Sequence, residues 1–344
     1  MSHRATLTPQ MLQYAEKFDD RGDIRWMPYL MYFHAAGHRS DVVNTDRLGF
    51  RVSEGPDGQK ASVGGPGPDG PVRLLAGSST AFGIGASTDG DTLSSYLWSK
   101  HAPSLPWLNF GGRSHNSTQE LLLFTLYRHL LPQVDEIVLF SGFNNLGLSR
   151  LPASVRGDSG AFFNCNDFSG QMEELRARNR KASAGRGLFG GRKKEAAEPA
   201  GQDLRVPELA EQIDLASELT LRHLDSWRLL AEGMGAKLTF VLQPLATWVR
   251  ETPAPQEKLI FDELDQISNF GEVYGDISSM SARETYSKEL QAGCERMGVR
   301  YLDINPVIAD AIGKDDWLFV DRIHFTDEGH DLVAGLLAKE LELS

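Results

Sequence analysis

The stretch VRLLAGSSTAFGIGAS, residues 72–87, passes without a break from an apolar run into small residues and hydroxyls. The apolar part, residues 72–77, has the length of a buried strand. Small residues at the mouth of a strand serve one of two purposes: they let the backbone make a crowded turn, or they display a hydroxyl. The stretch therefore predicts a strand that ends in a turn or in a functional site, and the rest of the chain must decide between them.

Four more short apolar runs come after it, and each ends in small or polar residues. They span residues 106–112, 136–142, 237–244 and 299–305. Segments with helical spacing of apolar residues lie between or after them, at 117–132, 206–235, 281–298 and 327–342, and Ser117 with Glu120 forms a capping-box pattern at the start of the first. Strands that alternate with helices indicate a parallel sheet covered on both faces. We therefore predict an α/β protein with three α/β/α layers around a mostly five-stranded parallel sheet.

The remaining segments suggest how the chain is organised. Residues 1–71 are expected to form an N-terminal extension that packs on a catalytic domain over residues 72–344. The region of about 170–204 is basic, rich in glycine and poor in apolar residues, which predicts a flexible surface insertion. Residues 245–279 come after the fourth strand, carry several aromatic residues, and are a candidate lid.

Composition excludes several kinds of partner. The chain has 344 residues and a net charge of −12, which argues against nucleic acid or an anionic membrane as the main partner.

The cysteines and the lack of apolar segments bear on the compartment. The two cysteines, Cys165 and Cys294, are far apart, which suggests a reducing compartment without a disulfide framework. We find no signal-peptide pattern and no apolar run long enough to span a membrane, so we expect a cytoplasmic protein.

Polar side chains gather where the predicted strands end. Because ligands bind at the carboxyl ends of the strands in open parallel sheets, these residues are the candidates for chemistry. They include hydroxyls, amides and glycines after the first four strands and, some way beyond the fifth, a carboxylate and an imidazole: Ser78, Ser79, Asn109, Gly111, Gly112, Ser114, Asn144, Gln243, Asp321 and His324. Such a set supplies the nucleophile, base, orienting group and oxyanion donors of acyl transfer.

Spacing argues against three other glycine-rich motifs around residues 77–88. A phosphate-binding P-loop requires a lysine after its last glycine, and none is present. A dinucleotide fingerprint requires a third glycine, where Thr88 stands instead. The nucleophile elbow G-x-S-x-G fails at its second glycine, which is Ala81.

Four blocks of the sequence, in order, resemble those of the SGNH, or GDSL-like, serine hydrolases. They are GSSTAFG (77–83), NFGGRSHNSTQE (109–120), SGFNNL (141–146) and DRIHF (321–325). The resemblance implies a flavodoxin-like fold and a metal-free serine hydrolase without a cofactor. It places the nucleophile at Ser79, the base at His324 and the orienting carboxylate at Asp321.

The same resemblance implies an oxyanion hole. Its donors would be the backbone N–H groups of Ser79 and Ser114 and the side-chain amide of Asn144. Ser114 stands where the family has a glycine, so Gly111 or Gly112 remains an alternative donor. Ser78 replaces the aspartate that precedes the nucleophile in the family, from which we expect altered local bonding with activity retained.

Substrate contacts are predicted for Asn109, Arg113, Gln243 and Trp248, with a structural role equally open for Asn109. The expected substrate is a small acylated metabolite or glycan, cleaved at a carboxylic ester. Two alternatives remain: an acyltransferase that uses the same residues, and an inactive binding protein. The sequence leaves open the acyl group, the alcohol and the oligomeric state.

Overall fold

The computed structural model describes residues 2–15, 25–65, 68, 70–163, 165, 172, 174, 176, 177, 205–268 and 270–344. The insertion predicted over about 170–204 therefore lies almost wholly outside the described residues.

A five-stranded parallel sheet forms the centre of the molecule, as predicted. Its strands are β5 (Val72–Gly77), β6 (Trp107–Gly111), β7 (Val134–Ser141), β8 (Lys237–Leu242) and β9 (Arg300–Asp303), in the order β6-β5-β7-β8-β9. All four pairings are parallel. In this flavodoxin-like order the strand sequence reverses beside β5, so a crevice is expected at the carboxyl ends of β5 and β7.

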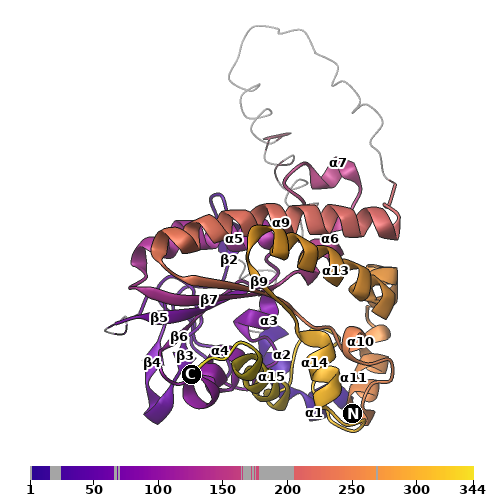
Figure 1. The fold of residues 1–344 in the computed structure, drawn as a ribbon. Coiled ribbons are helices and arrows are strands. Elements are labelled where there is room, and N and C mark those ends of the chain that lie inside the picture. The colour runs from indigo at the N-terminus through magenta and orange to yellow at the C-terminus, as the bar shows by residue number, and fades with distance from the viewer. Residues whose placement is uncertain are drawn as a thin grey trace, which may run out of the picture.

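Helices cover both faces of the sheet, which completes the three layers (Figure 1). One face carries α5 (Ser117–Tyr127), α6 (Phe143–Ser149), α9 (Leu209–Met234) and α13 (Met280–Met297). The other carries α4 (Leu93–Tyr96), α14 (Ile304–Ala311) and α15 (Asp327–Glu340). Shorter elements are α3 (Ser79–Phe82), α7 (Ala153–Arg156), η2 (Pro56–Gly58), η3 (Asp89–Asp91), η4 (Leu97–His101) and η5 (Arg128–Leu130).

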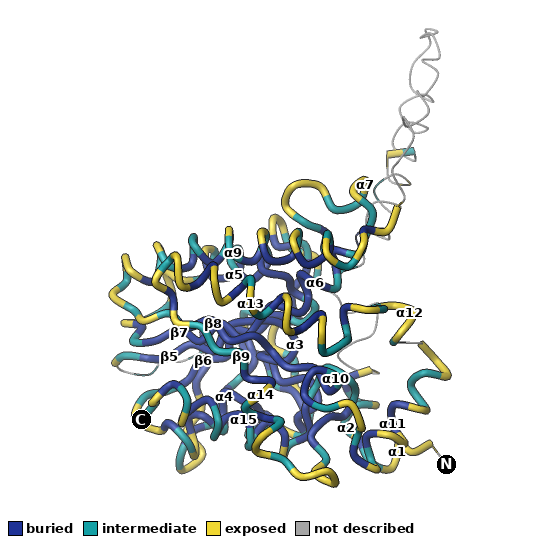
Figure 2. Tube along the Cα trace, turned by 45° about the vertical axis from the view of Figure 1, so that its right-hand side comes forward, coloured by how far each residue is buried: buried dark blue, intermediate teal, exposed yellow. Residues whose placement is uncertain are grey.

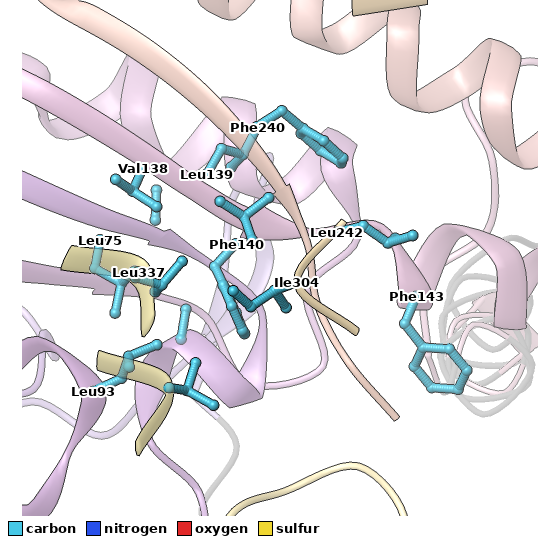
Figure 3. Close-up of a cluster of buried hydrophobic side chains, with 14 of the residues drawn as sticks. Leu75, Leu93, Val138, Leu139, Phe140, Phe143, Phe240, Leu242, Ile304 and Leu337 are labelled. Atoms are coloured by element: carbon cyan, nitrogen blue, oxygen red, sulfur yellow. The ribbon is translucent and has the colours of Figure 1, made fainter. Parts of the chain in front are cut away.

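The sheet is buried between these layers (Figure 2). Every residue of β5 is buried, because a parallel strand covered on both faces has no side that faces water. Figure 3 shows Leu75, Val138 and Phe140 from the sheet near Leu93, Leu337 and Ile304 from the helices α4, α15 and α14. This core fixes the strands whose ends carry the candidate site.

The start of α5 corrects the predicted capping box by one residue. The cap is Asn116, whose side-chain oxygen accepts the backbone N–H of Gln119 at 3.0 Å, and the Gln119 side chain accepts the N–H of Asn116 at 3.3 Å. Asparagine is a preferred N-cap residue, and it places Ser117 in the first turn. Glu120 is then buried and faces Ser141 on β7.

The N-terminal extension packs on the turn after β5. It contains α1 (His3–Leu7), α2 (Pro9–Gln13) and two antiparallel hairpins, β1 (Arg25–Met27) with β2 (Met31–Phe33) and β3 (Ser53–Glu54) with β4 (Lys60–Ala61). The buried guanidinium of Arg51 donates to the carbonyl of Gly83 at 2.7 Å and to Asp89 at 2.8 Å. The hydroxyl of Tyr14 donates to the same carbonyl at 3.0 Å.

The candidate lid, residues 245–279, folds into α10 (Ala246–Val249), α11 (Pro255–Asp265), α12 (Phe270–Tyr274) and η6 (Gly275–Ser278). The guanidinium of Arg322 makes two hydrogen bonds to Asp265, at 2.8 and 2.6 Å. This ion pair ties the end of α11 to the C-terminal loop, while the lid role stays a prediction. Within the described ranges, no helix combines the length and the apolar character that a membrane crossing needs.

Candidate active site

The turn after β5 is crowded and also displays a hydroxyl. Gly77 has a φ of +149°, and a Cβ atom there would lie 2.0 Å from the carbonyl oxygen of Phe140, so only glycine fits. Ser79 lies two residues after Gly77, as the first residue of α3, and 8% of its surface is exposed. Both explanations for the small residues at the mouth of this strand therefore hold.

Ser79, His324 and Asp321 form one chain of hydrogen bonds. The Oγ atom of Ser79 lies 2.8 Å from Nε2 of His324, and Nδ1 of His324 lies 2.8 Å from Oδ2 of Asp321. A neutral imidazole that donates from Nδ1 to the carboxylate has a lone pair at Nε2. That nitrogen therefore accepts the hydrogen bond from the serine hydroxyl.

The carboxylate of Asp321 is held in its ionised form. Its Oδ1 atom accepts the backbone N–H groups of Ile323 at 2.7 Å and of His324 at 2.8 Å. Burial alone would raise the pKa of Asp321, but the imidazole of His324 and these N–H donors outweigh burial and leave the pKa below its ordinary value. The ionised carboxylate thus orients the imidazole through the bond to Nδ1.

The loop after β6 carries three backbone N–H groups that were candidates for the oxyanion hole. The N–H of Gly111 donates to the side chain of Asn109 at 3.0 Å, and that of Gly112 donates to the carbonyl of Gly77 at 2.9 Å. For the N–H of Ser114 we find no acceptor among the described residues. The two glycine alternatives are thereby disfavoured, and Ser114 remains the candidate donor.

Ser114 adopts a backbone conformation that usually belongs to glycine. Its φ is +58°, in the left-handed region, which costs a residue with a side chain about 1–2 kcal/mol. Such strain persists where neighbouring groups fix the backbone. Here the Tyr32 hydroxyl donates to the carbonyl of Ser114 at 2.8 Å.

Asn144 lies at the start of α6, beside the same loop. Its Nδ2 atom donates to the carbonyl of His115 at 2.7 Å. An amide nitrogen carries two N–H groups, so the second can serve an oxyanion. Asn145, the next residue, points into a different network, where it donates to Ser117 at 2.7 Å and Thr220 at 2.6 Å.

Three of the four predicted substrate contacts are fully buried. Asn109, Gln243 and Trp248 each have 0% of their surface exposed. Asn109 donates to the carbonyls of Ala81 at 3.1 Å and Phe82 at 3.2 Å, and the Trp248 indole donates to Ile277 at 3.0 Å. These placements give the three residues hydrogen bonds within the framework around the site, and a direct substrate contact at each of them stays a prediction.

Gln243 binds the two neighbours of Ser79. Its Oε1 atom accepts the hydroxyl of Ser78 at 2.9 Å, and its Nε2 atom lies 3.3 Å from the hydroxyl oxygen of Thr80. Ser78 therefore contacts the end of β8, whereas Ser79 contacts His324. Of the two adjacent serines, Ser79 is the one bonded to the imidazole, and its role as the nucleophile stays a prediction.

Arg113 is the one predicted substrate contact that is partly exposed, so its prediction stays open. Its backbone N–H donates to Nε2 of His34 at 2.9 Å.

Two residues of the N-terminal extension, Tyr32 and His34, contact this loop. We did not predict these contacts from the sequence. An aromatic run at residues 27–34 was the only sign of them in the sequence.

A cavity of about 550 Å³ lies among residues of α6, α7 and α9. Its lining includes Asn116, Asn145, Leu148 and Leu219, and excludes Ser79, His324 and Ser114. It is therefore not the space in which an ester would meet the candidate nucleophile.

Comparison with solved structures finds similar folds at low identity. A G-D-S-L lipolytic protein from Veillonella parvula DSM 2008 is 12% identical, with 78% of this chain and 97% of that chain covered and a TM-score of 0.43. A lipase/acylhydrolase from Enterococcus faecalis is 12% identical, with 79% of this chain and 96% of that chain covered and a TM-score of 0.42. The acetyl xylan esterase AlAXEase is 12% identical, with 78% of this chain and 98% of that chain covered and a TM-score of 0.41.

Comparison with curated proteins finds no match. The sequence does match a family of ester hydrolases, the GDSL-like Lipase/Acylhydrolase family, over residues 75–332. This range contains all five strands of the sheet except the first residues of β5, and the loop that carries Asp321 and His324. The chain therefore belongs to the GDSL-like lipase/acylhydrolase family.

Proposed function

We propose that this protein is a serine hydrolase that cleaves a carboxylic ester of a small acylated metabolite or glycan. The observation that carries the proposal is the hydrogen-bonded chain Ser79–His324–Asp321, with both links at 2.8 Å. A serine hydroxyl attacks poorly unless a base takes its proton, and this chain supplies that base. Family membership supports the ester as the bond that is cleaved.

Acylation begins at the Oγ atom of Ser79, which attacks the carbonyl carbon while its proton moves to Nε2 of His324. The negative charge of Asp321 stabilises the resulting imidazolium. When the tetrahedral intermediate collapses, the alcohol leaves and takes the proton from Nε2. The acyl group remains bonded to Ser79.

Deacylation repeats these steps with water. His324 takes a proton from the water as it attacks the acyl carbonyl, and then returns the proton to Ser79 as the carboxylic acid leaves. In both half-reactions the carbonyl oxygen becomes an oxyanion. The N–H groups of Ser79 and Ser114 and the second N–H of Asn144 are the donors that would stabilise it.

Labelling with a fluorophosphonate, followed by intact mass measurement, tests the proposal. We expect one adduct on the wild-type protein and on Ser78→Ala, and none on Ser79→Ala. A screen of short acyl esters then defines the acyl group, and product analysis in the presence of a competing alcohol measures hydrolysis against transfer. Labelling that persists in Ser79→Ala would refute the proposed nucleophile.

A further inference from the structure

The short strand β2 of the N-terminal extension and the residue that follows it, His34, contact the loop after β6 through three hydrogen bonds. The Tyr32 hydroxyl donates to the carbonyl of Ser114 at 2.8 Å. The backbone N–H of Arg113 donates to Nε2 of His34, just beyond β2, at 2.9 Å. The ring of His115 makes the third bond, from Nε2 to the carbonyl of Tyr32 at 3.1 Å.

These bonds surround the peptide group that presents the N–H of Ser114. Arg113 is fixed on one side of that peptide, and the carbonyl of Ser114 is fixed on the other. Tyr32 contributes both its hydroxyl and its backbone carbonyl. The orientation of the Ser114 N–H therefore depends on β2 as well as on the loop itself.

His34 is suited to accept a hydrogen bond permanently. Its Nδ1 atom lies 3.0 Å from the carbonyl of Gly49, to which it donates, so Nε2 carries the lone pair that Arg113 requires. The side chain is buried, and burial, together with the nearby His115 and Arg113, holds the pKa of His34 well below 6.5. His34 thus stays neutral and keeps this tautomer.

We propose that Tyr32 and His34 are positioning residues that hold Ser114 in its left-handed conformation and so aim its N–H at the oxyanion. The inference rests on the proposed function for the role of Ser114. Both residues lie outside the range 75–332 that matches the family, so the extension adds contacts to this loop that the family region does not supply. Ser114 needs these contacts because its φ is +58°, a conformation that serine holds less readily than glycine does.

We call the three hydrogen bonds between Tyr32 or His34 and the loop the brace. The brace also helps to orient the second candidate donor, Asn144. The carbonyl of His115 accepts one N–H of Asn144 at 2.7 Å. Because the ring of His115 is bonded to Tyr32, the loop orients the amide of Asn144 and the N–H of Ser114 together. Loss of the brace should therefore lower turnover more than it weakens binding.

Tyr32→Phe is the primary test, since it removes only the hydroxyl. Tyr29→Phe is the matched control, because Tyr29 lies in the same hairpin and is 80% exposed. We expect Tyr32→Phe to lower kcat by about tenfold to a hundredfold, as for a displaced oxyanion donor, with KM nearly unchanged. Tyr29→Phe should match the wild type.

Ser114→Gly provides the second arm. Glycine adopts the left-handed conformation without help, so Tyr32→Phe should cost much less turnover in the Ser114→Gly background than in the wild type. An equal loss in both backgrounds would overturn the proposal, because it would show that the Tyr32 hydroxyl acts elsewhere than on Ser114. Replacing His34 with glutamine, which retains an acceptor, should lower kcat less than replacement with leucine.

Hydrogen exchange of the amides at 112–116 tests the brace without any assay of activity. Tyr32→Phe should speed exchange in this loop relative to Tyr29→Phe, and exchange rates equal to the control would overturn the proposal. The labelling of Ser79 decides the proposed function separately. Failure of the brace and failure of the hydrolase assignment therefore give different results.

Discussion

The imidazole of His324 lies 2.8 Å from the hydroxyl of Ser79, although the two residues are 245 positions apart in the chain. Ser79 is placed by the end of β5, whereas His324 is placed by a loop near the C-terminus. That loop is closed by the N–H of Val320, which donates to the carbonyl of His324 at 2.9 Å, and by the bonds to Asp321. Two segments far apart in the chain thus meet with a geometry that suits proton transfer.

This contact predicts unequal effects at two adjacent serines. Ser79→Ala should lower kcat/KM on a model ester by about a thousandfold or more, because it removes the oxygen proposed to attack the ester. Ser78→Ala should cost far less, since Ser78 donates to Gln243 and not to the imidazole. Steady-state kinetics on both variants, with folding checked by circular dichroism, makes the comparison, and a larger loss for Ser78→Ala would contradict the assignment.

Asn144 should act on turnover. Asn144→Ala removes one candidate oxyanion donor, and loss of such a donor typically lowers kcat by about a hundredfold to a thousandfold. KM should change little, since the bond to the developing charge strengthens in the transition state. If KM alone rose while kcat held, Asn144 would instead be a ground-state substrate contact.

Gln243 should behave as a positioning residue. Gln243→Leu leaves the buried hydroxyls of Ser78 and Thr80 without this partner, which costs about 1–3 kcal/mol of stability and loosens the turn around Ser79. We expect a lower kcat at an unchanged KM, whereas a substrate-binding role predicts a raised KM. Gln243→Glu retains two acceptors for the two hydroxyls, and it should recover more turnover than the leucine variant.

Glu120 should make stability depend on pH. Its buried carboxyl lies 2.8 Å from the hydroxyl oxygen of Ser141, and burial raises its pKa from 4.5 to about 8. Between these values the folded state holds a proton that the unfolded chain releases, so the stability contributed by Glu120 falls as pH rises. It is complete below pH 4.5 and is lost above about pH 8.

Glu120→Gln cannot titrate and isolates this contribution. Relative to Glu120→Gln, the wild type should lose unfolding free energy as pH rises from 4.5 to about 8. The loss should be at most about 1.4 kcal/mol for each pH unit. Urea unfolding at several pH values from about 5 to about 9, on either side of the raised pKa, measures it, with Glu218→Gln as the exposed control. Parallel pH curves for wild type and Glu120→Gln would show that Glu120 ionises normally.

Much of the fold could be predicted from local patterns. The first strand was predicted at residues 72–77 and is β5, Val72–Gly77, because a strand buried on both faces is a continuous apolar run. The helix predicted at 206–235 is α9, Leu209–Met234, since its apolar spacing is long and regular and it ends at Gly235. The capping box was wrong because Ser117–Glu120 and Asn116–Gln119 both have the required spacing, and only the contacts of the folded chain select one.

The candidate site was predicted less evenly. The motifs that contain Ser79, Asp321 and His324, and their order, can be recognised in the sequence. The structure brings these three side chains within hydrogen-bonding distance. Trp248 and Gln243 were expected to face a substrate because they come after a strand end, yet both are fully buried. Position along the chain identifies the rim of the sheet but does not say which way a side chain points.

The sequence by itself determined the order of strands and helices, the blocks that carry the candidate nucleophile, base and carboxylate, and the family. These depend on periodicity and short spacings, which are properties of neighbouring residues. Only the tertiary structure decided that the N–H groups of Gly111 and Gly112 are already bonded, which leaves Ser114 as the candidate donor, and that Tyr32 and His34 contact its loop. The contacts of Tyr32 and His34 join segments about eighty residues apart, and a hydrogen bond between distant segments exists only once packing has brought its donor and acceptor together.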